Sequence, residues 1–212
     1  GVQVYGGFDG TETLLSERDW FANPTVLSGD IDHNDTNKDA DGIVMNVSGI
    51  IGSNAYHVLV GSGADQTAVF DGFIINAGQA DGTTLYHNLG GGVYLTLGNP
   101  SLNNLVISAN TTNNQGAGLY NDRSTATLSN IAFRGNSATG SGHHGGGIFN
   151  HAGSPTLSNV LFSGNYAYHA SGFFTDGGDP TLINTTFSGN RGDNYATMHV
   201  GGGSPTLVNA IF

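Results

Sequence analysis

Five copies of one motif run through the chain from residue 90 towards its end. The clearest copy is GGGIFNHAGSPTL at 145–157, and the others lie at 90–102, 116–128, 170–182 and 195–207. The leucines that close successive copies are 26, 29, 25 and 25 residues apart, and the differences in length fall just before each glycine pair. A repeat with a period of roughly 20 to 50 residues is typical of a solenoid, a propeller or an array.

The first four copies continue into two asparagine positions, and the fifth continues into one. The first follows two residues after the closing leucine, at Asn104, Asn130, Asn159, Asn184 and Asn209. The second follows six residues later, at Asn110, Asn136, Asn165 and Asn190. Asparagine stacked at a bend can satisfy turn backbone and can hydrogen-bond to its own neighbours along the axis. We therefore expect both series to form structural ladders, with Asn159 and Asn184 buried.

Each repeat contains three short apolar runs and shows no helical periodicity. In the clearest copy these runs are 147–149, 155–158 and 160–162, and Gly, Pro and Asn separate them. Short apolar runs bounded by such residues are strand signals. Three strands per unit predict an all-β fold, a parallel β-helix with roughly 25–32 residues per coil and coils stacked at about 4.8 Å.

The repeat also resembles a known family. A glycine pair followed by an aliphatic residue (GGGVY, GAGLY, GGGIF) is combined with F-x-x-N (FRGN, FSGN). This combination resembles the repeats of polymorphic outer-membrane proteins and related bacterial surface proteins, over roughly residues 56–212. The resemblance implies a right-handed parallel β-helix of the pectate-lyase-like fold, and an extracellular or bacterial cell-surface location.

The repeats define the expected organisation of the chain. Residues 1–55 are expected to form an opening coil or cap that carries an acidic loop at 30–42, DIDHNDTNKDADG. Residues 56–212 are expected to form the β-helix as one continuous domain. Because Phe212 falls in the middle of a repeat, we expect the chain to be a fragment of a longer exported protein.

Composition limits the possible partners. Only 10% of the residues are charged, and the net charge is −11 with a single lysine, Lys38. Such a surface repels nucleic acid and anionic membranes, so we expect neither nucleic-acid binding nor membrane insertion of this segment. The chain has no cysteine and hence no disulfide framework. Three kinds of partner are compatible with this composition. They are a surface polysaccharide, a protein, and further copies of the chain joined through open β-helix ends or flat faces.

The acidic loop suggests a calcium site. Asn37, Asp39 and Asp41, followed by glycine, fit the first half of a D-x-[DN]-x-[DN]-G loop, which supplies oxygen ligands at alternate positions. The twelfth position is Ser48 where a bidentate Glu is expected, so this hypothesis needs another carboxylate, which Asp30, Asp32 or Asp35 could supply. The alternative is a solvated acidic turn. No other cofactor is expected.

Stacking of the repeats predicts a polar column. Equivalent positions of five coils carry, in order, Thr96, Asp122, His151, Asp176 and Gly201, with Arg123 alongside. Two coils of rise would separate the two carboxylates by about 9.6 Å, near the upper limit for inverting glycosidases. The competing interpretation is exposed polar turn residues without strong pKa shifts. The catalytic motifs of polygalacturonase-like members of this fold are absent from the sequence.

Two further columns are predicted from the same alignment. One contains Gln115, His144, His169 and Asn194, and with His143 it could bind a transition metal or simply form a polar ladder. The other contains the aromatic residues Tyr94, Tyr120, Phe149 and Phe174. Stacked aromatics either pack against one another or, if they face outwards, form a strip that binds sugars or a partner.

Three functions are compatible with these observations, because this fold serves many activities. We favour a non-enzymatic structural or adhesive module of a cell-surface or secreted protein. The first alternative is a carbohydrate-active enzyme, a polysaccharide hydrolase or lyase, that uses Asp122, His151, Asp176 and Arg123. The second alternative is a subunit of a filament or surface layer.

Overall fold

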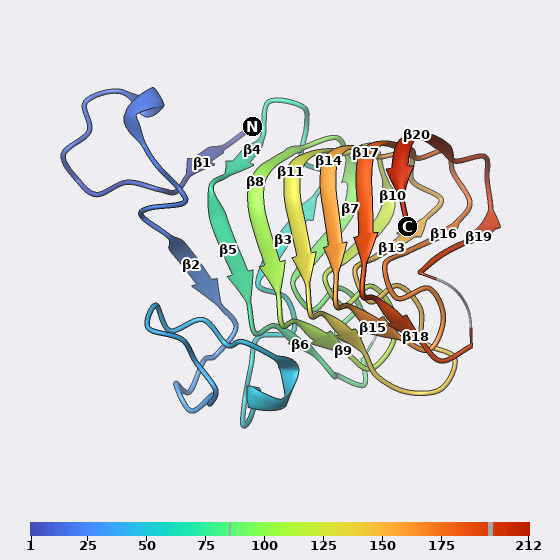
Figure 1. Cartoon of the computed structure of the whole chain (residues 1–212). Coiled ribbons are helices and arrows are strands. Elements are labelled where there is room, and N and C mark those ends of the chain that lie inside the picture. The colour runs from blue at the N-terminus through green and yellow to red at the C-terminus, as the bar shows by residue number, and fades with distance from the viewer. Residues whose placement is uncertain (85, 195–196) are drawn as a thin grey trace.

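The chain winds into a parallel β-solenoid. The computed structural model describes residues 1–84, 86–194 and 197–212, and in these residues the coils form about 4 turns stacked along one axis (Figure 1). Residues 195–196, which begin the fifth copy of the motif, lie outside the described residues. The all-β parallel β-helix expected from the repeat is confirmed.

The strands of the described residues form three parallel sheets that run along the solenoid. The nine-stranded sheet contains β1 (Gln3–Tyr5), β2 (Thr25–Ser28), β4 (Val69–Asp71), β5 (Phe73–Asn76), β8 (Ser101–Ser108), β11 (Thr127–Arg134), β14 (Thr156–Ser163), β17 (Thr181–Ser188) and β20 (Thr206–Ile211). The six-stranded sheet contains β3 (Leu59–Ser62), β7 (Val93–Gly98), β10 (Leu119–Ser124), β13 (Ile148–His151), β16 (Phe173–Asp176) and β19 (Met198–Gly202). The five-stranded sheet contains β6 (Gln79–Ala80), β9 (Thr111–Thr112), β12 (Ser137–Ala138), β15 (Tyr166–Ala167) and β18 (Arg191–Gly192).

Equivalent positions of successive repeats are strand partners. Leu128 of β11 pairs with Leu102 of β8 on one side and with Leu157 of β14 on the other. A slip of one residue would move every buried leucine to the solvent side. The hydrophobic pattern of the repeat therefore fixes the register of the whole solenoid.

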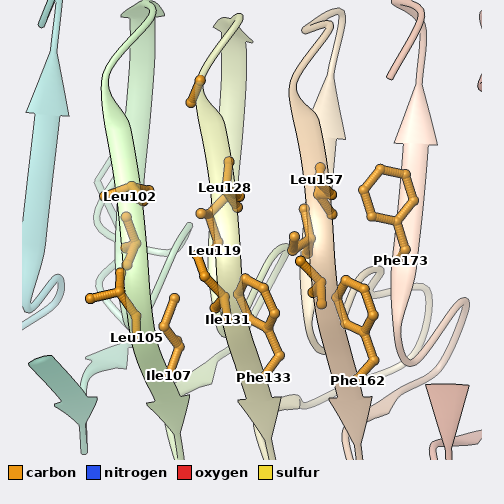
Figure 2. Packing of buried hydrophobic residues seen from close by; sticks show 14 of the residues in the cluster. Leu102, Leu105, Ile107, Leu119, Leu128, Ile131, Phe133, Leu157, Phe162 and Phe173 are labelled. Atoms are coloured by element: carbon orange, nitrogen blue, oxygen red, sulfur yellow. The ribbon is translucent and has the colours of Figure 1, made fainter. Parts of the chain in front are cut away.

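The core consists of columns of like side chains inside the coils. Figure 2 shows the leucines of β8, β11 and β14 at one level and the rings of Phe133 and Phe162 side by side at another. The Phe133 and Phe162 ring centroids are 5.1 Å apart, and those of Phe162 and Phe187 are 4.8 Å apart. These distances match the spacing of neighbouring strands, so each coil buries its apolar residues directly against the next.

The strand boundaries differ from those expected. The runs at 155–158 and 160–162 belong to a single strand, β14, and the third strand of the coil is the two-residue β15. Asn159 lies in the middle of β14 with φ of 55°, yet Ser158 and Val160 on either side keep their partners in β17. One residue in the left-handed region bends the strand without ending its pairing.

The N-terminal segment adds strands to the same solenoid. β1 pairs with β4 and β2 pairs with β5, and two excursions project beside these strands (blue in Figure 1). The first excursion carries the 3-10 helix η1 (Leu15–Glu17) and the second carries η2 (Val47–Gly49). In the described residues no helix is long and apolar enough to cross a membrane.

A buried ion pair ties the first excursion to the sheet. The Arg18 guanidinium lies 2.8 Å from a carboxylate oxygen of Asp71, and both side chains are almost fully covered. The same guanidinium lies over the rings of Tyr5 and Trp20, 5.1 Å from each centroid. Arg18 therefore holds Trp20 beside the nine-stranded sheet.

Candidate functional site

The second asparagine series forms a buried ladder. The carboxamide oxygen of Asn136 accepts hydrogen bonds from the backbone and side-chain nitrogens of Asn110, at 3.1 and 3.0 Å. Its side-chain nitrogen donates to the carbonyl of Ile107 at 2.8 Å and to Asn165 at 3.0 Å. Asn165 is bonded to Asn190 in the same way. This ladder closes the bend between the nine-stranded and five-stranded sheets.

The first asparagine series forms a second ladder on the outer surface. Asn130 donates to Asn104, Asn159 to Asn130 and Asn184 to Asn159, each at 3.1 Å, and Asn209 donates to Asn184 at 2.8 Å. The expectation that Asn159 and Asn184 are buried is wrong, because both are exposed. Their left-handed φ angles turn the side chains outwards, where they bond to one another and not to buried backbone.

The polar column lies along the six-stranded sheet in the expected order. Asp122 of β10 pairs with Thr96 of β7 and with His151 of β13, and His151 pairs with Asp176 of β16. The prediction that Gly201 is the fifth member is wrong. An irregularity in the pairing of β16 with β19 places Gly202 opposite Asp176. Side chains alternate across a strand, so this column lies on the outer side of the sheet.

Asp122 is held by its neighbour in the sequence. The Arg123 guanidinium donates to both carboxylate oxygens of Asp122, at 3.0 and 2.9 Å, and the Thr96 hydroxyl donates at 3.2 Å. These hydrogen bonds, chiefly those from Arg123, hold the pKa of Asp122 below its usual value. Asp122 was expected to be exposed, but only 7% of its surface is accessible, because the column packs it between neighbouring coils.

The other two members of the column are open to solvent. His151 Nδ1 lies 3.7 Å from Asp176 Oδ2, and roughly half of each side chain is accessible. Water surrounds both side chains, so an ion pair in this position contributes little. The column thus combines one ionised, clamped carboxylate with a solvent-exposed histidine–aspartate pair.

An aromatic stack runs beside the polar column on the same outer side. The rings of Tyr94, Tyr120, Phe149 and Phe174 lie nearly parallel, with centroids 5.6, 5.4 and 5.0 Å apart, and His199 continues the stack 5.0 Å beyond Phe174. Each of the four aromatic residues is at most 8% accessible. Burial, followed by the nearby Asp122 charge, raises the pKa of Tyr120. These rings are packing elements and not an open binding strip.

The histidine column forms a second stack against these rings. Gln115 pairs with His144 and His144 with His169, and the two imidazole rings are 4.8 Å apart. The His144 ring also lies 4.4 Å from that of Phe174. Among the described residues, no group of three His, Cys, Asp or Glu side chains is arranged to hold a metal ion. A transition-metal site at these histidines and His143 stays a prediction from the sequence.

The acidic loop uses its carboxylates as backbone acceptors. Asp39 accepts hydrogen bonds from the amides of Asp41 and Ile43, at 3.0 and 2.9 Å. Asp35 accepts from the Ile51 amide and from the Asn54 side chain, both at 2.8 Å. Asn37, with φ of 55°, is a turn residue. The proposed calcium ligands are Asn37, Asp39, Asp41 and Asp35. In the part of the chain that the structure describes, no group of three or more His, Cys, Asp or Glu side chains is arranged to hold a metal ion.

Lys38 provides the positive charge in this loop. Its ammonium group lies 2.6 Å from the Asp30 carboxylate. The same carboxylate accepts hydrogen bonds from the backbone amides of Asn34 and Asp35. Burial raises the pKa of Asp30, but the hydrogen bonds from Lys38 and the two amides outweigh this and leave the pKa below its ordinary value. Within the loop, Lys38 therefore neutralises the charge of Asp30, its most buried carboxylate.

Calcium binding by residues 30–42 stays a prediction, and chelation tests it. If calcium stabilises the loop, a chelator lowers the melting temperature and added calcium restores it. If the hydrogen bonds of Asp30, Asp35 and Asp39 suffice, the melting temperature does not change.

A groove lies on the outer face of the nine-stranded sheet, and no sequence pattern predicted it. Its volume is about 640 Å³. The floor is formed by outward residues of β5, β8, β11 and β14, including Asn104, Asn130 and Asn159 of the exposed ladder. The walls come from both N-terminal excursions, whose positions depend on tertiary contacts across many residues. No periodic pattern connects the walls to the floor.

Comparison with other proteins identifies no relative: no family model matches the chain, and no curated protein or solved structure shows significant similarity to it. The fold by itself therefore defines the class, that of parallel β-solenoid proteins. The resemblance to outer-membrane repeats and to the pectate-lyase-like fold family stays a prediction from the sequence motifs.

Proposed function

We propose that this chain is a non-enzymatic module of a secreted or cell-surface protein, with a structural or adhesive role. The parallel stacking of like residues supports a rigid rod, because each coil contacts only its neighbours and adds length at a constant rise. The exposed asparagine ladder and the low fraction of charged residues, 10% of the chain, suit such a role on a solvent-exposed surface.

The observation that carries this proposal is the Asp122–Arg123 pair. Glycoside hydrolysis needs one carboxylic acid whose pKa is raised, so that it can protonate the leaving group. The pKa of Asp122 is shifted downwards, mainly by Arg123, and both of its oxygens are occupied by that guanidinium. Asp122 therefore suits neither the acid nor a free nucleophile.

A carbohydrate-active enzyme is the second candidate, favoured by the contact between His151 and Asp176. A histidine within 3.7 Å of a carboxylate is a possible acid–base pair. This pair is open to water, and a base in such a position has little to shield it. We therefore rank a hydrolase or lyase below the non-enzymatic module.

Two measurements test the proposal together. The protein is incubated with neutral and acidic polysaccharides, and reducing ends and unsaturated products are assayed. We expect neither to appear. In parallel, beads coated with the folded protein should adhere to polysaccharide-coated or cell-coated surfaces, and beads coated with heat-unfolded protein should not.

The enzymatic alternative makes the opposite prediction. Product release that is abolished by Asp176→Asn, with the fold intact by circular dichroism, would establish catalysis by the column. Loss of adhesion on unfolding, without product release, supports the adhesive module.

A further inference from the structure

The groove on the nine-stranded sheet has an ordered aromatic wall. Phe21 is 92% accessible and Trp20 is 42% accessible, although both are large apolar side chains. Both residues lie on a turn that hydrogen bonds stabilise. The Asp19 carboxylate accepts hydrogen bonds from the backbone amides of Phe21 and Ala22, each at 3.0 Å. The Arg18 guanidinium packs over the Trp20 ring and fixes its position. These rings are presented to solvent by a fixed turn.

The floor of the groove offers side-chain groups and no free strand edge. Each of β5, β8, β11 and β14 is hydrogen-bonded to a strand on either side. A peptide that binds by adding a strand needs an open edge, and this floor does not provide one. A ligand here meets the exposed amides of Asn130 and Asn159.

The asparagine ladder retains hydrogen-bonding capacity toward the groove. A carboxamide has two N–H donors and two oxygen lone pairs, and the ladder uses one donor and one lone pair of Asn130. The same functional groups repeat at each coil, about 4.8 Å apart. A ligand matched to this floor is itself an extended chain with closely spaced hydroxyl groups.

The charges of the groove argue against an anionic ligand. Asp39 and Asp41 lie on the wall formed by the second excursion, and Arg134 lies at the floor. The chain as a whole carries a net charge of −11, which disfavours approach of a polyanion. Carboxylates, amides and a guanidinium are all good partners for uncharged hydroxyl groups, and aromatic rings pack against the apolar faces of sugar rings.

We propose that this groove, between the Trp20–Phe21 turn and the outer face of β8, β11 and β14, binds an extended, uncharged polysaccharide chain. The proposal rests on the adhesive function above and gives it a site and a ligand class. It places binding on the nine-stranded sheet, away from the Asp122, His151 and Asp176 column of the six-stranded sheet.

The chain's single tryptophan makes the test direct. Trp20 is the only tryptophan in the sequence, so intrinsic fluorescence reports on the groove wall itself. The probes are uncharged hexasaccharides of glucose, xylose, mannose and N-acetylglucosamine, with hexagalacturonate as the anionic comparison. We expect a saturable change in tryptophan emission with at least one uncharged probe, insensitive to salt, and none with hexagalacturonate.

Matched variants locate the site by calorimetric titration. Asn130→Gly keeps the left-handed backbone and removes the amide, and Phe21→Ala removes an exposed ring. Each should weaken binding about tenfold, the loss of one or two good contacts. The controls are Asn184→Gly, on the same ladder but outside the groove, and Phe8→Ala, another exposed phenylalanine that does not line it. Both should bind like the unmodified protein.

Three results would overturn the proposal. Binding that is unaffected by Asn130→Gly and Phe21→Ala would place the sugar elsewhere. Preferential binding of hexagalacturonate would exclude an uncharged ligand. Failure of every hexasaccharide, while coated beads still adhere to cells, would remove the polysaccharide ligand and leave the adhesive module standing with a protein partner.

Discussion

Asparagine performs two distinct tasks in each coil. In the buried series, represented by Asn136, the side chain replaces backbone partners at a bend that water cannot reach. In the exposed series, represented by Asn159, the residue adopts φ of 55°. Asparagine enters the left-handed region more readily than other residues with a β-carbon. One residue type thus serves hydrogen bonding in one series and mainly backbone geometry in the other.

The exposed series gives a prediction about backbone geometry. Asn159→Ala should lower the free energy of unfolding by about 1 to 2 kcal/mol, the cost of a β-carbon in the left-handed region. Asn159→Gly should cost clearly less, because glycine tolerates this conformation. Denaturant unfolding of the two variants measures the difference. Equal destabilisation by alanine and glycine would show that the amide, and not the backbone, is what matters.

The buried series gives a larger effect by a different cause. Asn136→Ala should lower the free energy of unfolding by about 3 kcal/mol, because it leaves the Ile107 carbonyl and the Asn110 amide buried without partners. Asn130→Ala, in the same coil but on the exposed series, is the comparison and should cost less. The prediction fails if the exposed substitution is the more damaging of the two.

At the scale of a strand, β17 contains one exception to the apolar core. Thr185 occupies the core column that Val160 fills in the preceding coil, and its surface is fully buried. Its hydroxyl has no hydrogen-bond partner among the described residues. A buried, unpaired hydroxyl costs free energy, so this position weakens the strand.

Replacement of that hydroxyl should stabilise the protein. Thr185→Val has nearly the same shape, and we expect it to raise the free energy of unfolding by about 1 kcal/mol. Thr186→Val, the next residue of β17 and on the outer side, is the matched control and should change little. Thermal and denaturant unfolding measure both. A loss of stability in Thr185→Val would reveal that the hydroxyl is satisfied in solution.

At the scale of the whole molecule, partly buried histidines link stability to pH. Partial burial, followed by the neighbouring His169 and His199, lowers the pKa of His144 below the ordinary value of a histidine. Burial likewise lowers the pKa of His169 and of His57. The unfolded chain therefore binds protons at a pH where the folded chain does not. Stability is fully present above pH 6.5 and falls as the pH drops below it.

This linkage can be measured and assigned. The free energy of unfolding should decline as the pH falls below about 6.5, before the carboxylates titrate. His144→Phe keeps an aromatic ring beside Phe174 and should flatten the decline. Thr186→Val, which changes no titratable group, is the control and should leave the decline unchanged. An unaltered slope in His144→Phe would exclude this histidine as a source of the pH dependence.

The repeat was sufficient to predict the class of fold but not its finer geometry. The leucine spacing predicted stacked coils, and the register of Leu102, Leu128 and Leu157 follows from it. The same alignment placed Asp122, His151 and Asp176 on one column. It failed for Asn159, because a sequence pattern does not distinguish a buried bend from a left-handed residue that turns its side chain to solvent. It also failed at Gly201, where a local irregularity shifts the register.

The sequence by itself determined the features that recur in register from coil to coil. Each coil contacts only the coils on either side of it. An in-register repeat therefore specifies the strand pairing, the core columns and the ladders without contributions from distant residues. The tertiary structure alone decided what depends on contacts outside the period. Arg18 reaches Asp71 across 53 residues and holds the first excursion. The Asn76 side chain hydrogen-bonds the Val44 backbone and holds the second. Both excursions line the groove over the exposed asparagine ladder. The groove exists because those aperiodic segments fold back on a periodic face.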